Sequence, residues 1–339
     1  MSAPSLAEPG AQAAPPARRR RRGLSGVTGA FWLFVGPFLV GLVIFVYAPI
    51  VWSVVLSFAR AQNTVTPRDW VGLQNYLDLL QPGPFLDSLI TFTIFAAFIV
   101  PLTFALSLAL ALLLNGIRFM RAFFRSVFFL PTACSYVVAA LVWKLSIFNG
   151  VRFGLANKVI GVFGVDNIAW LATTDPPWYW LVIVTVRLWL QVGFYMILFL
   201  AGLQRISPEL YEAAAVDGAR NAWQTFRYIT FPQLRATSVA VLLLLLINAY
   251  QAFDEFFNLL GNSSFARPPL VYLYYTAQGN QDFGHGTAGA VILALLIMIV
   301  TLAQPVIRMM TVNTAIHMTQ AMAMDTMAVA VIPVTERSK

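Results

Sequence analysis

Charged residues are scarce in this chain. Only 11% of its 339 residues are Asp, Glu, Lys or Arg, whereas 59% are hydrophobic, and an ordinary soluble domain has roughly 25% charged residues. A soluble protein of this length needs far more charge on its surface. The composition therefore predicts an integral membrane protein, in which hydrocarbon replaces water as the solvent around most of the chain.

Cysteine and histidine are rare and a glycine–lysine pair is absent, and each shortage excludes a class of function. Cys134 is the single cysteine, so an intramolecular disulfide is impossible. The two histidines, His285 and His317, do not have the HExxH spacing of an embedded zinc hydrolase. No lysine follows a glycine, so the chain has no Walker A loop for ATP. The sequence predicts no catalytic residue, no metal site and no cofactor in this chain, and we expect it not to be an enzyme.

The net charge of +8 would suggest a nucleic-acid partner if the chain were soluble. Five of the positive charges, however, form the run Arg18 to Arg22 immediately before an apolar stretch, which is typical of a membrane-topology signal. No nucleic acid is therefore expected. Residues 1–29 are rich in Ala, Pro and Arg and are predicted to be a disordered, basic cytoplasmic tail.

Six apolar stretches follow, and each reaches the length of about 20 residues that a helix needs to cross a bilayer. Helices are required because lipid cannot hydrogen-bond a free backbone, and the sequence lacks the ~10-residue alternation of barrel strands. The predicted fold is an all-α integral membrane protein with six transmembrane helices within residues 30–311. The predicted spans are Phe31–Ala59, Leu86–Leu114, Val127–Phe148, Trp178–Gln204, Ala236–Phe257 and Ala288–Thr311.

Lys and Arg fall mostly on one side of this six-span arrangement. Fifteen of the 22 lie in the N-terminal tail, the 115–126 and 205–235 loops and the C-terminal tail, whereas the opposite loops hold five. Positive residues accumulate on the cytoplasmic side of membrane proteins. Both termini are therefore predicted to be cytoplasmic.

The cytoplasmic loop between the fourth and fifth predicted spans has the pattern of two short helices. Ser207 and Pro208 suit the N-cap and first turn of the first helix, and Gly218 can take the left-handed conformation that ends it. The second helix carries an apolar stripe and is predicted to end at Pro232. Glu212 and the alanines after it give the first helix a small face that fits a groove in another protein. The alternative is a loop that rests on lipid headgroups, and the pattern alone favours neither.

This loop matches a known motif in order and spacing. It resembles the EAA motif of permeases from binding-protein-dependent ABC importers of the maltose-type carbohydrate-uptake family, through Glu212-Ala213-Ala214, Asp217-Gly218-Ala219, Phe226, Ile229 and Pro232. Flanking segments are also similar to that family, and they include Gly72-Leu73-Gln74-Asn75-Tyr76 and the run from Phe124 to Pro131. The resemblance extends from about residue 30 to 310. The chain departs from it at Phe231, where the family usually has Leu, and at Ala236, where it usually has Pro.

The resemblance implies that the chain is the transmembrane permease subunit of an ATP-driven importer in the bacterial inner membrane, and that its solute is small and polar, a sugar or related carbohydrate. The implied partners are a second, different permease subunit, two ATPase subunits that bind the ATP and Mg²⁺, an extracytoplasmic solute-binding protein, and membrane lipid. Residues 312–339 would be a C-terminal cytoplasmic tail, and nothing in the family indicates its role. The residues implied to couple the ATPase are Glu212, Ala213, Ala214, Asp217, Gly218, Phe226 and Pro232.

Polar side chains on the fifth predicted span indicate a translocation pathway. Asn248, Gln251 and Glu255 lie at positions i, i+3 and i+7, so they share one helix face that lipid would penalise. Asn248 and Gln251 line a path for a polar solute or hydrogen-bond between helices. For Glu255 we favour the second role, at an exposed position near the outer interface. Arg187 is the most deeply placed charge and belongs to the same pathway prediction; it needs a partner that the sequence does not identify.

An ion-coupled secondary transporter that works without an ATPase is the alternative. Such a protein would usually show internal repeats and acidic residues inside its spans. The sequence shows no clear repeat, and Asp254 and Glu255 lie near the end of a span. The sequence therefore favours the importer subunit over the secondary transporter.

Overall fold

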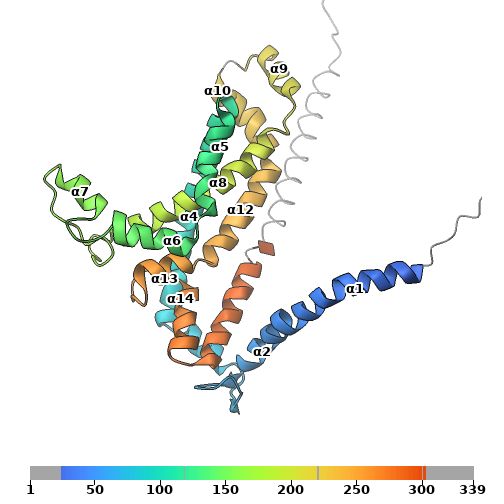
Figure 1. Cartoon of the computed structure of the whole chain (residues 1–339), viewed down its shortest axis with the longest axis vertical. Helices are drawn as coiled ribbons and strands as arrows, with labels where there is room; N and C mark the ends of the chain where they lie inside the picture. Colours follow the sequence, from blue (N-terminus) through green and yellow to red (C-terminus); the bar gives the residue numbers. More distant parts are fainter. Residues whose placement is uncertain (1–23, 118, 220, 300, 303–339) are drawn as a thin grey trace, which may run out of the picture. The chain divides into compact units, whose positions relative to one another are not determined.

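The computed structural model describes residues 24–299 apart from 118 and 220, together with residues 301 and 302. These residues divide into two units, one within residues 1–52 and one within residues 53–339 (Figure 1). Within the described part, the regular structure is helical except for a small antiparallel pair of strands. In that pair β1 (Ala59–Arg60) places Ala59 opposite Trp70 of β2 (Asp69–Trp70).

The first unit is almost entirely helical. It contains α1 (Leu24–Leu42), the π-helical turn η1 (Val43–Tyr47) and the start of α2 (Ala48–Leu56). The apolar run Phe31–Leu56 is long enough to cross a membrane, and most of its large side chains are exposed, as expected for a surface that faces lipid. Because α1 begins at Leu24, residues 24–29 are helical, unlike the disordered tail predicted for 1–29. The rest of that predicted tail lies outside the described residues.

The second unit begins with the β1–β2 pair and α3 (Gln74–Leu80), and its first long helix is α4 (Pro84–Gly116). Proline suits the start of α4 because the first turn of a helix has no partner for its N–H groups. Pro101 lies inside the same helix, where the membrane environment tolerates it. The predicted second span is therefore present as one helix of 33 residues.

The third predicted span, Val127–Phe148, is not one straight helix. The chain forms α5 (Arg121–Phe129), the 3₁₀ turn η2 (Leu130–Ala133), α6 (Tyr136–Val142) and the π-helical turn η3 (Trp143–Ile147). The two halves meet at an angle of 93°. Pro131 lies in the 3₁₀ turn, and the Ser135 hydroxyl accepts a bond from the Val137 N–H to cap a new helix. The sequence prediction missed this break.

The remaining helices complete the second unit. They are α7 (Leu155–Gly161), α8 (Tyr179–Leu203), α9 (Pro208–Val216), α10 (Ala222–Thr225), η4 (Phe226–Thr230), α11 (Phe231–Gln233), α12 (Arg235–Tyr250), α13 (Asp254–Leu260), α14 (Pro269–Tyr274), η5 (Tyr275–Gly279) and a final helix that the structure describes over Phe283–Ile299.

The described helices include four candidate membrane spans, or five if the bent pair counts as one. The sixth predicted span, Ala288–Thr311, falls partly in the final helix, which is shorter than a span as described. Residues 303–311 and the predicted tail 312–339 lie outside the described residues.

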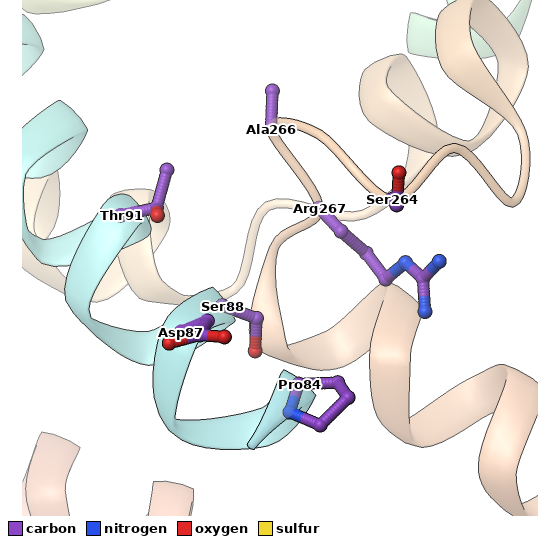
Figure 2. Close-up of a pocket in the computed structure, with 7 residues that line it drawn as sticks. All are labelled: Pro84, Asp87, Ser88, Thr91, Ser264, Ala266 and Arg267. Carbon is purple, nitrogen blue, oxygen red and sulfur yellow. The ribbon is translucent and has the colours of Figure 1, made fainter. Parts of the chain in front are cut away.

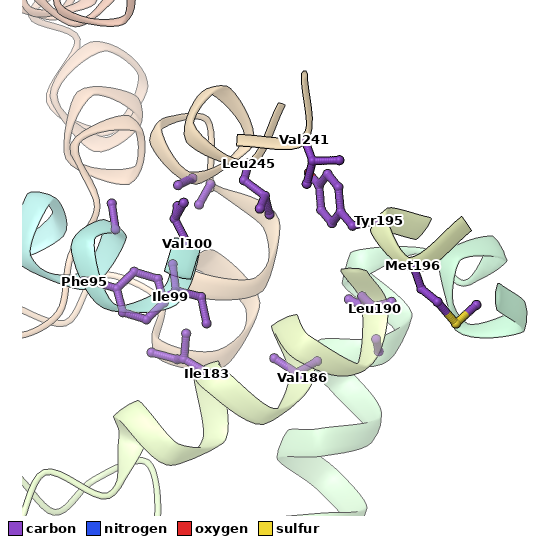
Figure 3. Close-up of a cluster of buried hydrophobic side chains, with 14 of the residues drawn as sticks. Phe95, Ile99, Val100, Ile183, Val186, Leu190, Tyr195, Met196, Val241 and Leu245 are labelled. Carbon is purple, nitrogen blue, oxygen red and sulfur yellow. The ribbon is translucent and has the colours of Figure 1, made fainter. Parts of the chain in front are cut away.

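The core of the second unit lies where α4, α8 and α12 pack together (Figure 3). Ile99 of α4 lies beside Ile183 of α8, and Val241 of α12 lies beside Tyr195 of α8. Membrane helices associate through close van der Waals packing, which small residues allow. Two glycines of α8 show this: Gly193 lies against the carbonyl of Phe128 in α5, and Gly202 lies against the Thr237 side chain in α12.

Candidate functional site

The loop after α8 begins with α9 and ends in a glycine turn. Ser207 has extended backbone angles and Pro208 occupies the first turn, as predicted, although the Ser207 hydroxyl makes no capping bond. At the other end Gly218 has φ +93°. The N–H of Ala219 donates to the Ala214 carbonyl at 2.9 Å and that of Gly218 donates to the Ala215 carbonyl at 3.4 Å. This bond pair is a Schellman motif, which reverses the chain direction and requires a left-handed residue.

The second half of the loop is one helical run made of α10, η4 and α11. The Asn221 side chain starts it by accepting a bond from the Gln224 N–H at 2.8 Å. Pro232 lies in α11 and does not end the run, which continues to Gln233. The missing N–H of Pro232 is tolerated because it falls in the first turn of a new α-helical segment after the π turn.

A contact between two hydroxyls joins the halves of the loop. The Tyr211 hydroxyl of α9 lies 3.3 Å from the Thr230 hydroxyl of η4. Within the second half, the half-buried Phe226 packs between Trp223 and Phe231 with ring centroids 5.7 Å from each. The loop is therefore a helix–turn–helix whose second half is stabilised by ring contacts of Phe226.

The outer face of the loop is apolar and hollowed. Val216 is 87% exposed and Trp223 is 66% exposed. Glu212 and Ala213 of α9 are also exposed, as is Pro232. A hollow of about 360 Å³ lies between the two halves and is lined by Ala214, Asp217, Gly218, Ala219, Gln224, Tyr228 and Ile229. The structure thus groups Ala214, Asp217 and Gly218 at one depression, with Glu212 and Ala213 on the adjoining helix.

A second cluster of predicted residues surrounds a buried ion pair. Arg187 of α8 is 1% exposed and Glu255 of α13 is 2% exposed, and their side chains form a salt bridge. The prediction that Glu255 is exposed near the outer interface was therefore wrong. Glu255 is buried because it supplies the countercharge that Arg187 needs inside the membrane domain.

The fifth predicted span is interrupted beside this pair. α12 ends at Tyr250 and α13 starts at Asp254, so Gln251, Ala252 and Phe253 form a break. The Asn248 carbonyl accepts a bond from Nη2 of Arg187 at 2.8 Å, and the Asn248 side-chain oxygen accepts from the same nitrogen at 3.3 Å. Irregular backbone at membrane depth persists only where protein or a cavity satisfies it.

Two residues that the sequence reasoning missed complete the cluster. Gln191 Nε2 donates to the Asn248 side-chain oxygen at 2.7 Å and to the Tyr136 hydroxyl at 3.0 Å. Gln191 lies four residues after Arg187, on the same helix face, so helical spacing was a usable signal. Tyr136 follows the helix break of the third predicted span and gave no comparable signal.

A polar cavity of about 150 Å³ opens at this cluster. Asn248 and Gln251, which the sequence analysis assigned to a translocation pathway, both line it. Arg187 does not line the cavity, but its guanidinium hydrogen-bonds to Asn248, which does. The cavity is lined by Tyr136, Asn248, Gln251, Ala252, Phe253, Asp254 and Glu255.

Another polar hollow, of about 270 Å³, lies between the start of α4 and the loop after α13 (Figure 2). Asp87, Ser88 and Thr91 of α4 line one side of it, and Ser264 and Arg267 line the other. The Arg267 guanidinium donates to two carbonyls of its own loop. None of these residues was singled out from the sequence, because they come from two segments far apart in the chain.

A third cluster surrounds His285, which lies at the start of the final helix. Its ring lies 2.9 Å from the carboxylate of Asp282 and 3.5 Å from that of Asp78 in α3. The hydrogen bond that the His285 ring donates to the Asp282 carboxylate raises the pKa of His285. Burial alone would raise the pKa of Asp282, but its hydrogen bonds with His285 outweigh that effect and lower it. Two carboxylates therefore favour a protonated His285.

Comparison with known proteins identifies the family. Residues 76–310 match the family described as binding-protein-dependent transport system inner membrane component, and the chain belongs to that family. It is the permease subunit of a binding-protein-dependent ABC importer, an integral, multi-pass inner-membrane protein and a transport component rather than an enzyme. The family predicted from the loop motif is confirmed, and the secondary transporter belongs to a different class.

Similar proteins include two whose names refer to starch degradation products and to arabinooligosaccharides. The probable starch degradation products transport system permease protein AmyD of Thermoanaerobacterium thermosulfurigenes is 31% identical over 277 residues, which are 81% of this chain and 92% of that protein. The arabinooligosaccharides transport system permease protein AraP of Halalkalibacterium halodurans is 30% identical over 279 residues, covering 80% of this chain and 85% of that protein.

The fold is also similar to a solved structure. A chain of a bacterial ABC transporter involved in the import of the acidic polysaccharide alginate superimposes with a TM-score of 0.72 at 22% sequence identity. The match covers 84% of this chain and 96% of that one. At this identity the likeness shows the permease fold alone.

Proposed function

We propose that this permease imports an oligosaccharide, which passes through the polar cavity at the α12–α13 break. The supporting observation is the cavity itself: Asn248, Gln251 and Tyr136 bring amide and hydroxyl groups together at a helix break inside the apolar domain. Polar groups in such a position mark solute pathways. The relatives AmyD and AraP are named for starch degradation products and for arabinooligosaccharides, which supports this class of solute.

The loop from α9 to α11 is the proposed contact with the ATPase. Its exposed apolar residues, its hollow at Gly218 and the exposed carboxylate of Glu212 give a surface that another protein can cover. In this proposal two ATPase subunits bind the ATP and Mg²⁺, and Glu212, Ala213, Ala214, Asp217, Gly218, Phe226 and Pro232 couple their motion to this chain.

The complete assembly includes a second permease subunit and an extracytoplasmic solute-binding protein. We place six spans in this subunit, with the bent pair as the third and the final helix, continued beyond Ile299, as the sixth. Both termini and the α9–α11 loop are then cytoplasmic, in agreement with the distribution of Lys and Arg. The His285 cluster and the Arg267 hollow are then on the outer side.

Sugar uptake by the reconstituted complex tests this function. Proteoliposomes that contain this chain and its partner subunits are supplied with ATP inside and with the binding protein loaded with tritiated maltotriose or arabinotriose outside. ATP-dependent uptake of at least one sugar is expected, and Asn248→Ala and Gln251→Ala should lower it about tenfold, since each removes hydrogen bonds to the sugar.

The matched control is Asn258→Ala. Asn258 lies on α13, and its side chain bonds to the Asp254 carbonyl at 2.7 Å, so its removal should leave uptake near the wild-type rate. Uptake of neither sugar would refute the proposed solute class. Equal uptake by the Asn248, Gln251 and Asn258 variants would refute the proposed path.

A further inference from the structure

The hydrogen bonds that Arg187 and Gln191 make at the polar cavity run in one direction, toward Asn248 and Tyr136. The side-chain oxygen of Asn248 accepts from both Arg187 and Gln191. A carboxamide has one oxygen acceptor and one NH₂ donor. Since Asn248 lines the cavity and its oxygen is engaged on the protein side, the NH₂ group is what it can offer to a solute.

Tyr136 is oriented in the same way. Gln191 Nε2 has two protons and gives one to Asn248 and the other to the Tyr136 hydroxyl. The hydroxyl oxygen therefore accepts a bond, and its own proton stays available. Tyr136 also lines the cavity, so Asn248 and Tyr136 both present donors there.

Arg187 acts on Asn248 through the helix break. In an unbroken helix the Asn248 carbonyl would accept the N–H of Ala252. Here that N–H donates to Ala249 instead, at 3.2 Å, and the guanidinium of Arg187 takes its place on the Asn248 carbonyl at 2.8 Å. The Arg187 guanidinium has hydrogen-bond donors and no acceptor. It cannot reverse the polarity of this contact, and Glu255 holds its charge in place.

We propose that Arg187 and Gln191 are positioning residues that orient Asn248 and Tyr136, so that the Asn248 NH₂ group and the Tyr136 hydroxyl proton face the oxygen atoms of a polyhydroxylated solute in the cavity. This inference rests on the proposed path through the cavity and adds which groups orient it. Neither Arg187 nor Gln191 needs to touch the solute.

A double variant separates this role from simple structural support. Removing one partner of a buried ion pair leaves an uncompensated charge, whereas replacing both with apolar residues is often neutral. Arg187→Met is therefore expected to reduce the yield of assembled complex, and Arg187→Met with Glu255→Met is expected to restore it. The double variant frees the Asn248 amide to turn, and the amount of maltotriose or arabinotriose imported per ATP hydrolysed should fall about tenfold.

Two changes at Gln191 test hydrogen-bond direction with little change of shape. Gln191→Glu supplies oxygens in place of the NH₂ donor, and these would accept the Asn248 and Tyr136 protons that otherwise face the cavity. Gln191→Met removes the donor without adding an acceptor. The sugar imported per ATP should fall about tenfold in the Glu variant and about threefold in the Met variant.

The outcomes separate the possible failures. If the double variant does not assemble, the two Gln191 variants are the test of the positioning role. The same ratio of imported sugar to hydrolysed ATP in the Glu variant and in the Met variant would overturn that role. A wild-type ratio in an assembled double variant would overturn it as well. If Asn248→Ala lowers the ratio while the Arg187 and Gln191 variants keep it, only this inference fails. If Asn248→Ala itself keeps the wild-type ratio, the proposed path fails.

Discussion

Replacement of Gly218 isolates the contribution of the turn between the two halves of the coupling loop. Gly218 has φ +93°, and no atom lies within 4 Å of the position that a Cβ would occupy. A side chain here therefore meets open space in this chain. The cost of a substitution comes from the backbone conformation.

That cost can be bounded. A left-handed conformation costs a residue with a Cβ roughly 1–2 kcal/mol, and a β-branched residue tolerates it least. A difference of one or two kcal/mol changes the ratio of two conformations by a factor of about 5–30. Gly218→Val should therefore lower the ratio of the turn to its alternative conformations by about 5–30-fold. Gly218→Asn should reduce it much less, because asparagine adopts this region most readily after glycine.

The assay measures sugar uptake and ATP hydrolysis stimulated by the loaded binding protein, in the same proteoliposomes. Gly218→Val should lower both by about 5–30-fold, and Gly218→Asn should keep most of each. Basal ATP hydrolysis should persist in both variants, since this chain contains no Walker A loop. Wild-type uptake and stimulation in the Val variant would refute the role assigned to the turn.

Three further predictions concern other parts of the chain. Gly193→Ala should lower thermal stability by about 1–3 kcal/mol, because a Cβ there overlaps a carbonyl of α5; Gly161→Ala, in open space within a helix, should not lower it, and equal melting temperatures would contradict the packing. Glu212→Gln should reduce stimulated ATP hydrolysis about tenfold through loss of a charge-assisted contact, and an unchanged rate would exclude that contact. The pKa of His285 is raised in the folded chain, so the stability that it adds to the loops around it is fully present below the pKa of His285 in the unfolded chain and is lost as pH rises through its pKa in the folded chain. The pKa of Asp282 is lowered, so the stability that this carboxylate adds is lost as pH falls through its pKa in the folded chain. Amide exchange in residues 281–286 should therefore speed up as pH rises from about 6 to about 8 beyond the intrinsic rate, and His285→Gln should remove that excess.

The family and the two helices of the α9–α11 loop could be predicted from the sequence because their signals are local. The turn at Gly218 needs a residue without a Cβ, and the helix before it has a proline start and a Schellman end, all within one short segment. Long apolar runs likewise predicted α4 and α8, because bilayer thickness sets the length of a span. Such features depend on neighbours in the chain.

The breaks in the third and fifth predicted spans were missed because they depend on distant partners. The interruption at Gln251 is stabilised by Arg187, which lies on another helix, and only the folded chain shows that its side chain reaches the freed carbonyl of Asn248. The burial of Glu255 has the same origin. Its position near the end of a predicted span suggested exposure at the membrane interface, but in the structure Glu255 is buried because it forms an ion pair with Arg187. The bend after Phe129 combines Pro131 in a 3₁₀ turn with a serine cap whose partner is only visible in the structure.

Crosslinking from the loop tests the coupling role most directly. In a Cys134→Ser background, which removes the single native cysteine, Ala213→Cys is placed on the exposed face of α9 and Phe153→Cys, at a side chain that is 88% exposed, serves as the control on the opposite side. A thiol-directed crosslinker in intact cells should join position 213 to a nucleotide-hydrolysing subunit and join position 153 to no such protein. Adducts of position 213 with lipid alone, and never with an ATPase, would contradict the assignment.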